Sequence, residues 1–423
     1  MAKVTMILNE REARSARTKI ASIDAALESQ NVLEPIVAGL PPEVVTHVTK
    51  ALKNERTELY EILDAFETAT KSKNFEKLRE QTSEKPGLAL IVARISKGMT
   101  QKDLARRLGI KEQQVQRYEA ERYKTISLER YENIAALLGV KLSASSAPFS
   151  GREFLIEDIK PDEVKKILRH GRKNGWFSED ADENELRRFI ASNRIEYGSP
   201  SKLRTGLGVL DLGGDLLLHA WRARVTARAR TIIAKSKPQF DILNLTWLRT
   251  LVSLSVDDNG PSRARELLLD HGIVLIAEPQ IQGLALDGAA FIVDGVPVIG
   301  MTLLRDKVDN FWFTLLHEVG HVVLHFNKGL GLGFFDRIDA EAVEQEEMEA
   351  NNFASNLLIP EELWRRSPVR IARSGAVIEK FAKQIGVNPA IVFGRIQKER
   401  GDYKTFSSKI GRNKVRKQLM SEP

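Results

Sequence analysis

The sequence of 423 residues contains no cysteine, which excludes disulfide bonds and thiolate-bound metals. A tightly bound transition metal must then sit on histidine, aspartate or glutamate side chains. No apolar run approaches the roughly 20 residues that a membrane-spanning helix requires. The first residues, MAKVTMILNEREARSARTKIA, also lack the apolar segment of an export signal. These absences favour a cytoplasmic protein with no membrane partner.

Acidic residues are fewer than basic ones: the sequence has 57 Asp and Glu and 64 Lys and Arg, which gives a net charge of +7. The excess is concentrated in two places. Residues 88–142 carry 11 basic against 6 acidic residues, and residues 394–417 carry 9 against 2. A basic surface indicates an anionic partner such as nucleic acid. A basic end of a chain is by itself usually a solvated tail, so the second excess predicts only such a tail.

The length suits two or three domains. Charged stretches with apolar residues three or four apart predict helices over most of the chain, and SEKPG and SASSAPFSG interrupt them as expected domain boundaries. After residue 271, the runs GIVLIAEP, GAAFIVDG and VPVIGMTL predict a small sheet with a hairpin. The fold class is therefore mainly α with a small α+β part. The expected ranges are a helical arm at 1–83, a helical domain at 88–143, a helical connecting region at 152–260, an α+β domain at 261–400 and a basic tail at 401–423.

The stretch MTQKDLARRLGIKEQQVQRYEAE, residues 99–121, predicts two short helices joined by a tight turn. Thr100 is suited to be the N-cap of the first helix, with the acidic Asp103 three residues on. Gly109 is suited to end that helix in the left-handed conformation. A second helix that follows such a turn forms a helix-turn-helix.

Apolar residues of the second helix, Val115 and Tyr118, would pack inward and leave a polar face outward. Gln and Arg can form paired hydrogen bonds with adenine and guanine edges in the major groove. Lys102, Arg106 and Arg107 are placed to neutralise phosphates. The alternative is a polar surface on an ordinary helical bundle. The residues expected to contact DNA are Gln101, Lys111, Glu112, Gln113, Gln114 and Arg117.

This stretch resembles the lambda-repressor-like (XRE) helix-turn-helix family. The pairs that carry the resemblance are Thr100-Gln101, Leu104-Ala105, Leu108-Gly109 and Tyr118-Glu119, and LERYENIAALLGVKL looks like the fourth helix of that fold. The resemblance implies a four- or five-helix domain that binds a double-stranded DNA operator. Because such modules usually bind paired half-sites, it also implies a homodimer.

A second motif lies in DNFWFTLLHEVGHVVLHFN, residues 309–327. On a helix, His317 and His321 lie one turn apart on the same face and can reach one metal ion. Glu318 beside them is the residue expected to take a proton from the attacking water. The alternative is an amphipathic helix that carries histidines by chance. The bulky FWFTLL run, the sheet upstream and an acidic helix at 340–358 all favour the metal site.

The third ligand is expected to be a carboxylate. Along a continuous helix His325 lies roughly 12 Å from His317, too far to share the ion, so His325 is expected to end the helix or to support a ligand. Glu347 is favoured because Asn351, four residues on, could hydrogen-bond to it. The same helix is predicted to turn an apolar face inward. That face comprises Met348, Phe353, Leu357 and Leu358. The alternatives to Glu347 as the third ligand are Glu346 and Glu349.

The pairing of DNFWFTLLHEVGHVVLH with EMEANNFASNLLIP resembles the ImmA/IrrE family of zinc metallopeptidases. The resemblance implies a zincin-like domain in which His317 and His321 bind Zn²⁺, Glu318 is the general base and a glutamate of the second helix is the third ligand.

Together the two resemblances lead to two hypotheses. The first is a DNA-binding transcriptional regulator with a zinc endopeptidase domain that cleaves a repressor-type protein, or itself. The second is an XRE repressor, or the antitoxin of a toxin–antitoxin pair, whose peptidase-like domain senses a metal, ligand or partner without cutting. Either protein would be cytoplasmic and associated with the nucleoid.

Overall fold

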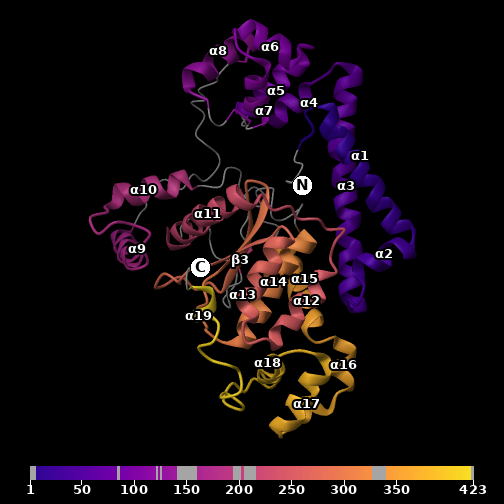
Figure 1. Cartoon of the computed structure of the whole chain (residues 1–423), viewed down its shortest axis with the longest axis vertical. Coiled ribbons are helices and arrows are strands. Elements are labelled where there is room, and N and C mark those ends of the chain that lie inside the picture. The colour runs from indigo at the N-terminus through magenta and orange to yellow at the C-terminus, as the bar shows by residue number, and fades with distance from the viewer. Residues whose placement is uncertain are drawn as a thin grey trace. The chain divides into compact units, whose positions relative to one another are not determined.

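A computed structural model describes most of the chain, which divides into two compact units (Figure 1). The helical unit comprises residues 4–25 and 54–150, and the sheet unit comprises residues 1–3, 26–53 and 151–423. The arm expected at 1–83 is thus shared between the two units. The predicted linker at 143–151 and the glycine-rich run at 329–335 lie outside the described residues. Those residues are 6–82, 86–120, 122–123, 126–140, 160–193, 202–203, 216–325 and 340–420.

The helical unit is built on one apolar core. Leu90, Leu104, Val115 and Ile134, from four successive helices, are completely buried in it. This confirms the predicted small helical domain, in which each helix turns an apolar stripe inward. The helices α1 (Glu10–Glu28) and α3 (Pro42–Ser72) each have residues in both units. The other helices of the helical unit are α4 (Glu76–Thr82), α5 (Pro86–Ser96), α6 (Gln101–Leu108), α7 (Glu112–Ala120) and α8 (Leu128–Leu138).

The sheet unit places a small mixed sheet among helices (Figure 1). The strands are β1 (Lys202–Leu203), β2 (Val274–Ala277), β3 (Gly288–Val293) and β4 (Val296–Met301), in the order β1-β3-β4-β2. The helices are α2 (Gln30–Val37), α9 (Pro161–Lys173), α10 (Glu183–Ser192), α11 (Leu216–Ser236), α12 (Trp247–Ser253), η2 (Leu254–Val256), α13 (Gly260–Asp270), α14 (Val308–His325), α15 (Ala340–Leu358), α16 (Glu361–Arg366), η3 (Pro368–Ile371), α17 (Gly375–Ile385), α18 (Pro389–Arg400) and α19 (Arg416–Leu419).

The predicted hairpin is formed by β3 and β4, which pair antiparallel from Gly288↔Met301 to Val293↔Val296. Its turn is Asp294-Gly295, and both residues have positive φ, 49° and 84°. A two-residue turn of this kind matches the twist of the flanking strands. β2 joins β4 in parallel on the other side. The structure thus confirms a mainly α protein with a small α+β part.

The sheet lies between α11 and α14. A Cβ on Gly300 of β4 would come within 2.6 Å of the Trp221 ring on α11, whereas a Cβ on Gly288 of β3 would come within 2.9 Å of Thr314 on α14. Every residue of β2, β3 and β4 is buried. The strands therefore form continuous apolar runs, as sheets covered on both faces do.

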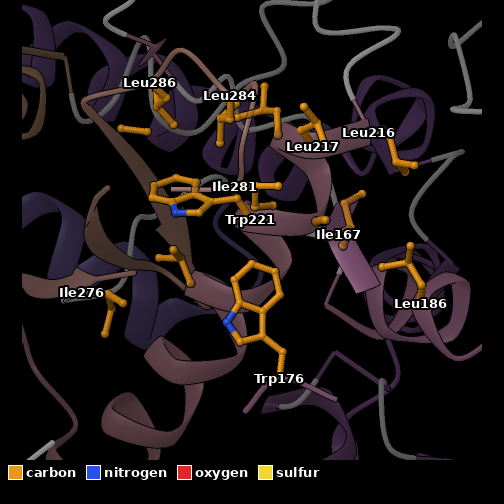
Figure 2. Close-up of a cluster of buried hydrophobic side chains, with 14 of the residues drawn as sticks. Ile167, Trp176, Leu186, Leu216, Leu217, Trp221, Ile276, Ile281, Leu284 and Leu286 are labelled. Atoms are coloured by element: carbon orange, nitrogen blue, oxygen red, sulfur yellow. The ribbon is translucent and has the colours of Figure 1, made fainter. Parts of the chain in front are cut away.

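Helices from the expected connecting region at 152–260 contribute to the core of the sheet unit. Ile167, Trp176 and Trp221 pack with Ile276 and Leu284 in one buried cluster (Figure 2). The connecting region is thus part of the layer that covers one face of the sheet.

A buried carboxylate fixes this layer to the sheet. Glu278, directly after β2, accepts hydrogen bonds from Trp176 Nε1 at 2.7 Å and from Arg228 Nη1 at 2.9 Å. Its backbone oxygen accepts a further one from Trp221 Nε1 at 3.2 Å. A buried charge is tolerated where such donors surround it.

Residues 401–420 fold back onto the sheet unit and are not a solvated tail. Ile410, Val415 and Leu419 are each about 1% exposed. The Asp306 carboxylate, just before α14, accepts from the backbone N–H of Val415 at 3.0 Å and of Arg416 at 3.2 Å. The prediction of a solvated tail was wrong because it rested on the net charge of this segment and not on the apolar residues spaced through it. Among the described helices, none combines the length and hydropathy that crossing a bilayer would require.

Candidate functional site

The candidate metal site lies on α14, which is buried on nearly all sides. It packs against β3, α15 and α18, and 15 of its 18 residues are buried. A helix that is apolar all round belongs in a protein interior. His317, Glu318 and His321 are all completely buried. Their polar side chains therefore need partners supplied by the fold.

The structure brings the predicted ligands together. The Nε2 atoms of His317 and His321 are 3.0 Å apart. Glu347 of α15 places one carboxylate oxygen 3.2 Å from the first and the other 3.2 Å from the second. These three residues form a group with the spacing of a metal site. The favoured Glu347, rather than Glu346 or Glu349, is the carboxylate that faces both histidines.

This donor set suits zinc. With bonds of about 2.0–2.1 Å, two neighbouring ligand atoms of a tetrahedral site lie about 3.3 Å apart. The separations of 3.0–3.2 Å in this group are close to that value. Two imidazoles and one carboxylate also form a ligand set that leaves one tetrahedral position open.

The site holds Glu347 as a carboxylate. Burial, the largest influence, acts to raise the pKa of this group, but the hydrogen bonds and charges of His317 and His321 outweigh it. The net effect places the pKa of Glu347 well below its ordinary value. An anionic Glu347 between two imidazoles is the protonation state that a divalent cation requires.

Close contact between α14 and α15 makes this meeting of side chains possible. A Cβ on Gly320 would lie 3.3 Å from Cα of Ala350 and 3.1 Å from the Phe353 ring. The absence of a side chain at Gly320 therefore lets α15 approach the histidines. Phe353, Leu357 and Leu358 are buried as predicted, but Met348 is 55% exposed and does not belong to the inward face. At 100° per residue, Met348 lies about 140° from Phe353 around the helix axis.

Glu318 lies against the first residue of β3. A Cβ on Gly288 would be 3.2 Å from both Cγ and Oε1 of Glu318. Gly288 was not among the predicted site residues, because a lone glycine at the start of a strand carries no indication of what packs over it.

Two predicted residues have other surroundings. His325, the last residue of α14, places Nδ1 3.3 Å from Nδ1 of His321 and Nε2 2.9 Å from Oε2 of Glu349. Glu349 is therefore a partner of His325, outside the group of ligand atoms. The hydrogen bond from His325 and the ion pair with Lys50 outweigh burial, which acts in the opposite direction, and lower the pKa of Glu349 to about 2. The contacts of the described residues include no hydrogen bond from Asn351 to Glu347, and its supporting role stays a prediction.

The predicted helix-turn-helix is formed by α6 and α7. Thr100 caps α6 by accepting from the Asp103 N–H at 3.0 Å, and its own N–H donates to the Asp103 carboxylate at 3.1 Å. Gly109 ends the helix with φ 65°. Val115 and Tyr118 of α7 are buried against the core. The local prediction is confirmed at both ends of the first helix.

The side chains expected to contact DNA are not equally available. Lys111, Glu112, Gln113 and Arg117 are exposed, whereas Gln101 and Gln114 are partly buried. The Gln114 side chain accepts from the Lys111 N–H at 3.2 Å, and Gln101 donates to Glu119 at 2.7 Å. Gln113 and Arg117 lie one turn apart on the exposed face of α7.

A buried ion pair holds α5 and α7 together. Arg94 Nε and Nη2 donate to the two oxygens of Glu119 at 2.5 and 2.8 Å, and Nη1 donates to the Met99 carbonyl at 2.6 Å. A bidentate pair of this kind fixes orientation as well as distance. Glu119 belongs to the Tyr118-Glu119 pair that carried the family resemblance, whereas no motif in the sequence pointed to Arg94.

Two family models match the chain. A helix-turn-helix model covers residues 90–144, and a peptidase-family model described as an IrrE N-terminal-like domain covers residues 304–395. The first match includes α6 and α7, and the second includes α14 and α15 with all three candidate ligands. No curated protein and no solved structure matches the chain. Both resemblances predicted from the motifs are confirmed: the chain joins an XRE-like helix-turn-helix to an IrrE-type domain.

Proposed function

We propose that this DNA-binding regulator carries an active zinc endopeptidase in its IrrE-type domain, which cleaves a repressor-type protein or the chain itself. The observation that carries the proposal is the meeting of His317, His321 and Glu347 within 3.2 Å of one another, with Glu318 between the two histidines in the helix.

His317, His321 and Glu347 would hold zinc, which supplies a Lewis acid that polarises a peptide carbonyl and makes water more acidic. Glu318 would take the proton of the attacking water and deliver it to the leaving amine. Its burial against Gly288 limits the rotamers open to it and keeps bulk water away from the carboxylate. A general base held in this way is oriented before the substrate arrives.

The helix-turn-helix would bring this activity to DNA. The exposed Gln113 and Arg117 are suited to paired contacts with base edges, and the Arg94–Glu119 pair holds their helix in place. An operator with two half-sites would be bound by a homodimer. The regulator would then act in the cytoplasm, on the nucleoid.

The test is incubation of the full chain with zinc and a DNA-bound XRE-type repressor, followed by intact mass measurement of both proteins. We expect new fragments with the native chain and none with Glu318→Gln. Native mass spectrometry must show that this variant keeps one zinc per chain. Fragments that persist in the zinc-loaded variant would refute the role of Glu318.

A second candidate function is favoured by the complete burial of His317, Glu318 and His321. A closed site suits a repressor or antitoxin in which the metal stabilises the domain and a ligand or a toxin partner binds to the domain so stabilised. On this alternative, Glu318→Gln leaves operator binding and repression unchanged, and no fragment appears under any condition.

A further inference from the structure

His321, one of the proposed metal ligands, also contacts a second group of polar residues on the other side of its ring. His321 lies 3.3 Å through Nδ1 from Nδ1 of His325, and His325 lies 2.9 Å through Nε2 from Oε2 of Glu349. His321 is completely buried and His325 is 5% exposed, so water cannot readily replace these contacts. Glu349 also accepts from Lys50 of α3 at 2.6 Å.

Donor and acceptor counting favours the following arrangement of protons along this line of contacts. His321 turns Nε2 toward His317 and Glu347, so a metal there requires Nε2 to be unprotonated. A neutral imidazole then carries its proton on Nδ1, which must donate. Nδ1 of His325, 3.3 Å away, is an acceptor for it, and the proton of His325 then lies on Nε2. That N–H meets the Glu349 carboxylate, which can only accept.

The geometry excludes His325 from the ligand set. It meets His321 at Nδ1, on the opposite side of the ring from the Nε2 atom that joins the ligand group. Glu349 is likewise turned to His325 and Lys50.

We propose that His325 and Glu349 are positioning residues, which hold the His321 ring in the tautomer and orientation that present Nε2 to the metal. The inference rests on the proposed metal function and adds two residues to it. Contacts of this kind typically contribute a factor of about 10–100 to metal affinity. The unusual feature is that a second histidine stands between the carboxylate and the ligand.

The test measures the affinity of the full chain for Zn²⁺ and Co²⁺ by competition with a chromophoric chelator, together with the visible spectrum of the Co²⁺ form. We expect His325→Leu to weaken Zn²⁺ binding about 10–100-fold and to change the Co²⁺ bands. His325→Asn keeps an acceptor near the Nδ1 position and should lose less than the leucine variant. Glu349→Gln should fall between native protein and His325→Leu.

Lys50→Met is the matched control, because it removes the ion pair of Glu349, whose carboxylate also accepts from Gln345 at 3.2 Å, and leaves the histidines untouched. It should bind Zn²⁺ as the native chain does. If Lys50→Met weakens binding as much as Glu349→Gln, the effect of Glu349 acts through its ion pair and the proposal is overturned for that residue.

The remaining outcomes separate this inference from the proposed function. A native chain that takes up neither metal overturns both. A native chain that binds metal while His325→Leu keeps the same affinity and spectrum overturns only the positioning role. Thermal unfolding checks that each variant is folded. Should His325→Leu fail to fold, the Zn²⁺ affinities of His325→Asn and Glu349→Gln, each compared with that of the native chain, test the positioning role in its place.

Discussion

Gly288 and Glu318 are in direct contact: the position that a Cβ would occupy on Gly288 lies 3.2 Å from the Oε1 atom of Glu318. The first residue of a strand thereby defines one wall around the proposed general base. No other residue type leaves this space free, because even a methyl group would be closer than most Cβ contacts in proteins.

Gly288→Ala should crowd Thr314 at 2.9 Å and Glu318 at 3.2 Å, displace the Glu318 carboxylate and leave the candidate metal ligands in place. We expect normal zinc content and a loss of cleavage of about 10²-fold, the usual effect of a small misplacement of a catalytic group. The assay is intact mass measurement of substrate fragments against time. Gly300→Ala is the control, because its methyl group would meet Trp221 on the other face of the sheet. That variant should lose stability, and an equal loss of activity per folded molecule would count against the Gly288 contact.

Removal of the metal should destabilise the sheet unit. A ligand present at a free concentration of 100 times its dissociation constant stabilises a fold by about 2.7 kcal/mol. A chelator that removes the metal should therefore lower the melting temperature by several degrees. Glu347→Ala should lack this response, because it removes a ligand. Glu346→Ala should retain it. A chelator response that disappears in Glu346→Ala and persists in Glu347→Ala would assign the third ligand to Glu346.

Loss of one partner of the Arg94–Glu119 pair should destabilise the helical unit strongly. Breaking a buried ion pair leaves an uncompensated charge and typically costs about 3–5 kcal/mol. We expect Arg94→Met alone to lower the unfolding free energy in urea by that amount. The double variant Arg94→Met with Glu119→Leu should recover much of the loss. If the loss in the double variant equals the sum of the two single losses, the coupling energy between Arg94 and Glu119 is zero and the expectation is contradicted.

Gln113→Ala and Arg117→Ala should each weaken binding to a specific operator by about 1–3 kcal/mol per lost base contact. Binding to unrelated DNA should change much less. Lys102→Ala is the comparison, since loss of a phosphate contact should weaken both kinds of binding alike and reduce the salt dependence. Measurement by fluorescence anisotropy at two salt concentrations distinguishes the cases. Operator affinity that survives loss of both Gln113 and Arg117 would reject α7 as the reading helix.

Stability should fall in mild acid, in part through His170. Burial is the largest influence on its pKa and lowers it below the ordinary value of 6.5. As the pH falls below 6.5, the unfolded chain takes up this proton before the folded chain does, so the contribution is complete above 6.5 and is lost as the pH falls toward the folded pKa. His170→Phe keeps an aromatic ring against Trp176 and should lose less stability between roughly pH 7.5 and pH 5. The stability of both proteins is measured by thermal unfolding at each pH. Equal losses of stability in the two proteins would mean that groups other than His170 cause the response to acid.

The parts of the fold that depend on neighbours in sequence were predictable. Thr100, Asp103 and Gly109 define α6 through contacts within one or two turns, and the spacing of His317 and His321 needs only a helix. Glu347 was favoured among several glutamates from its helix alone.

Contacts between distant segments were not predictable from one sequence. Nothing local indicates that Gly288 will lie on Glu318 or that Arg94 will meet Glu119. The segment after residue 400 was misjudged because its charge was counted and the spacing of Ile410, Val415 and Leu419 was not. Helix geometry predicted that His325 lies outside the candidate ligand group. Its contact with Glu349 was not predictable, because it depends on an approach of α15 that Gly320 permits.

The return of residues 410–419 to the start of α14 has a consequence for timing during synthesis. Val308 donates its backbone N–H to the carbonyls of Ile410 and Gly411, and Asp306 accepts from Val415, 109 residues further along the chain. Protein domains are completed in the order in which the ribosome releases them. The helix-turn-helix can therefore fold and find DNA while the helix that holds His317 and His321 still lacks its anchor. A nascent chain would then carry a complete helix-turn-helix before the helix of the candidate metal site is anchored.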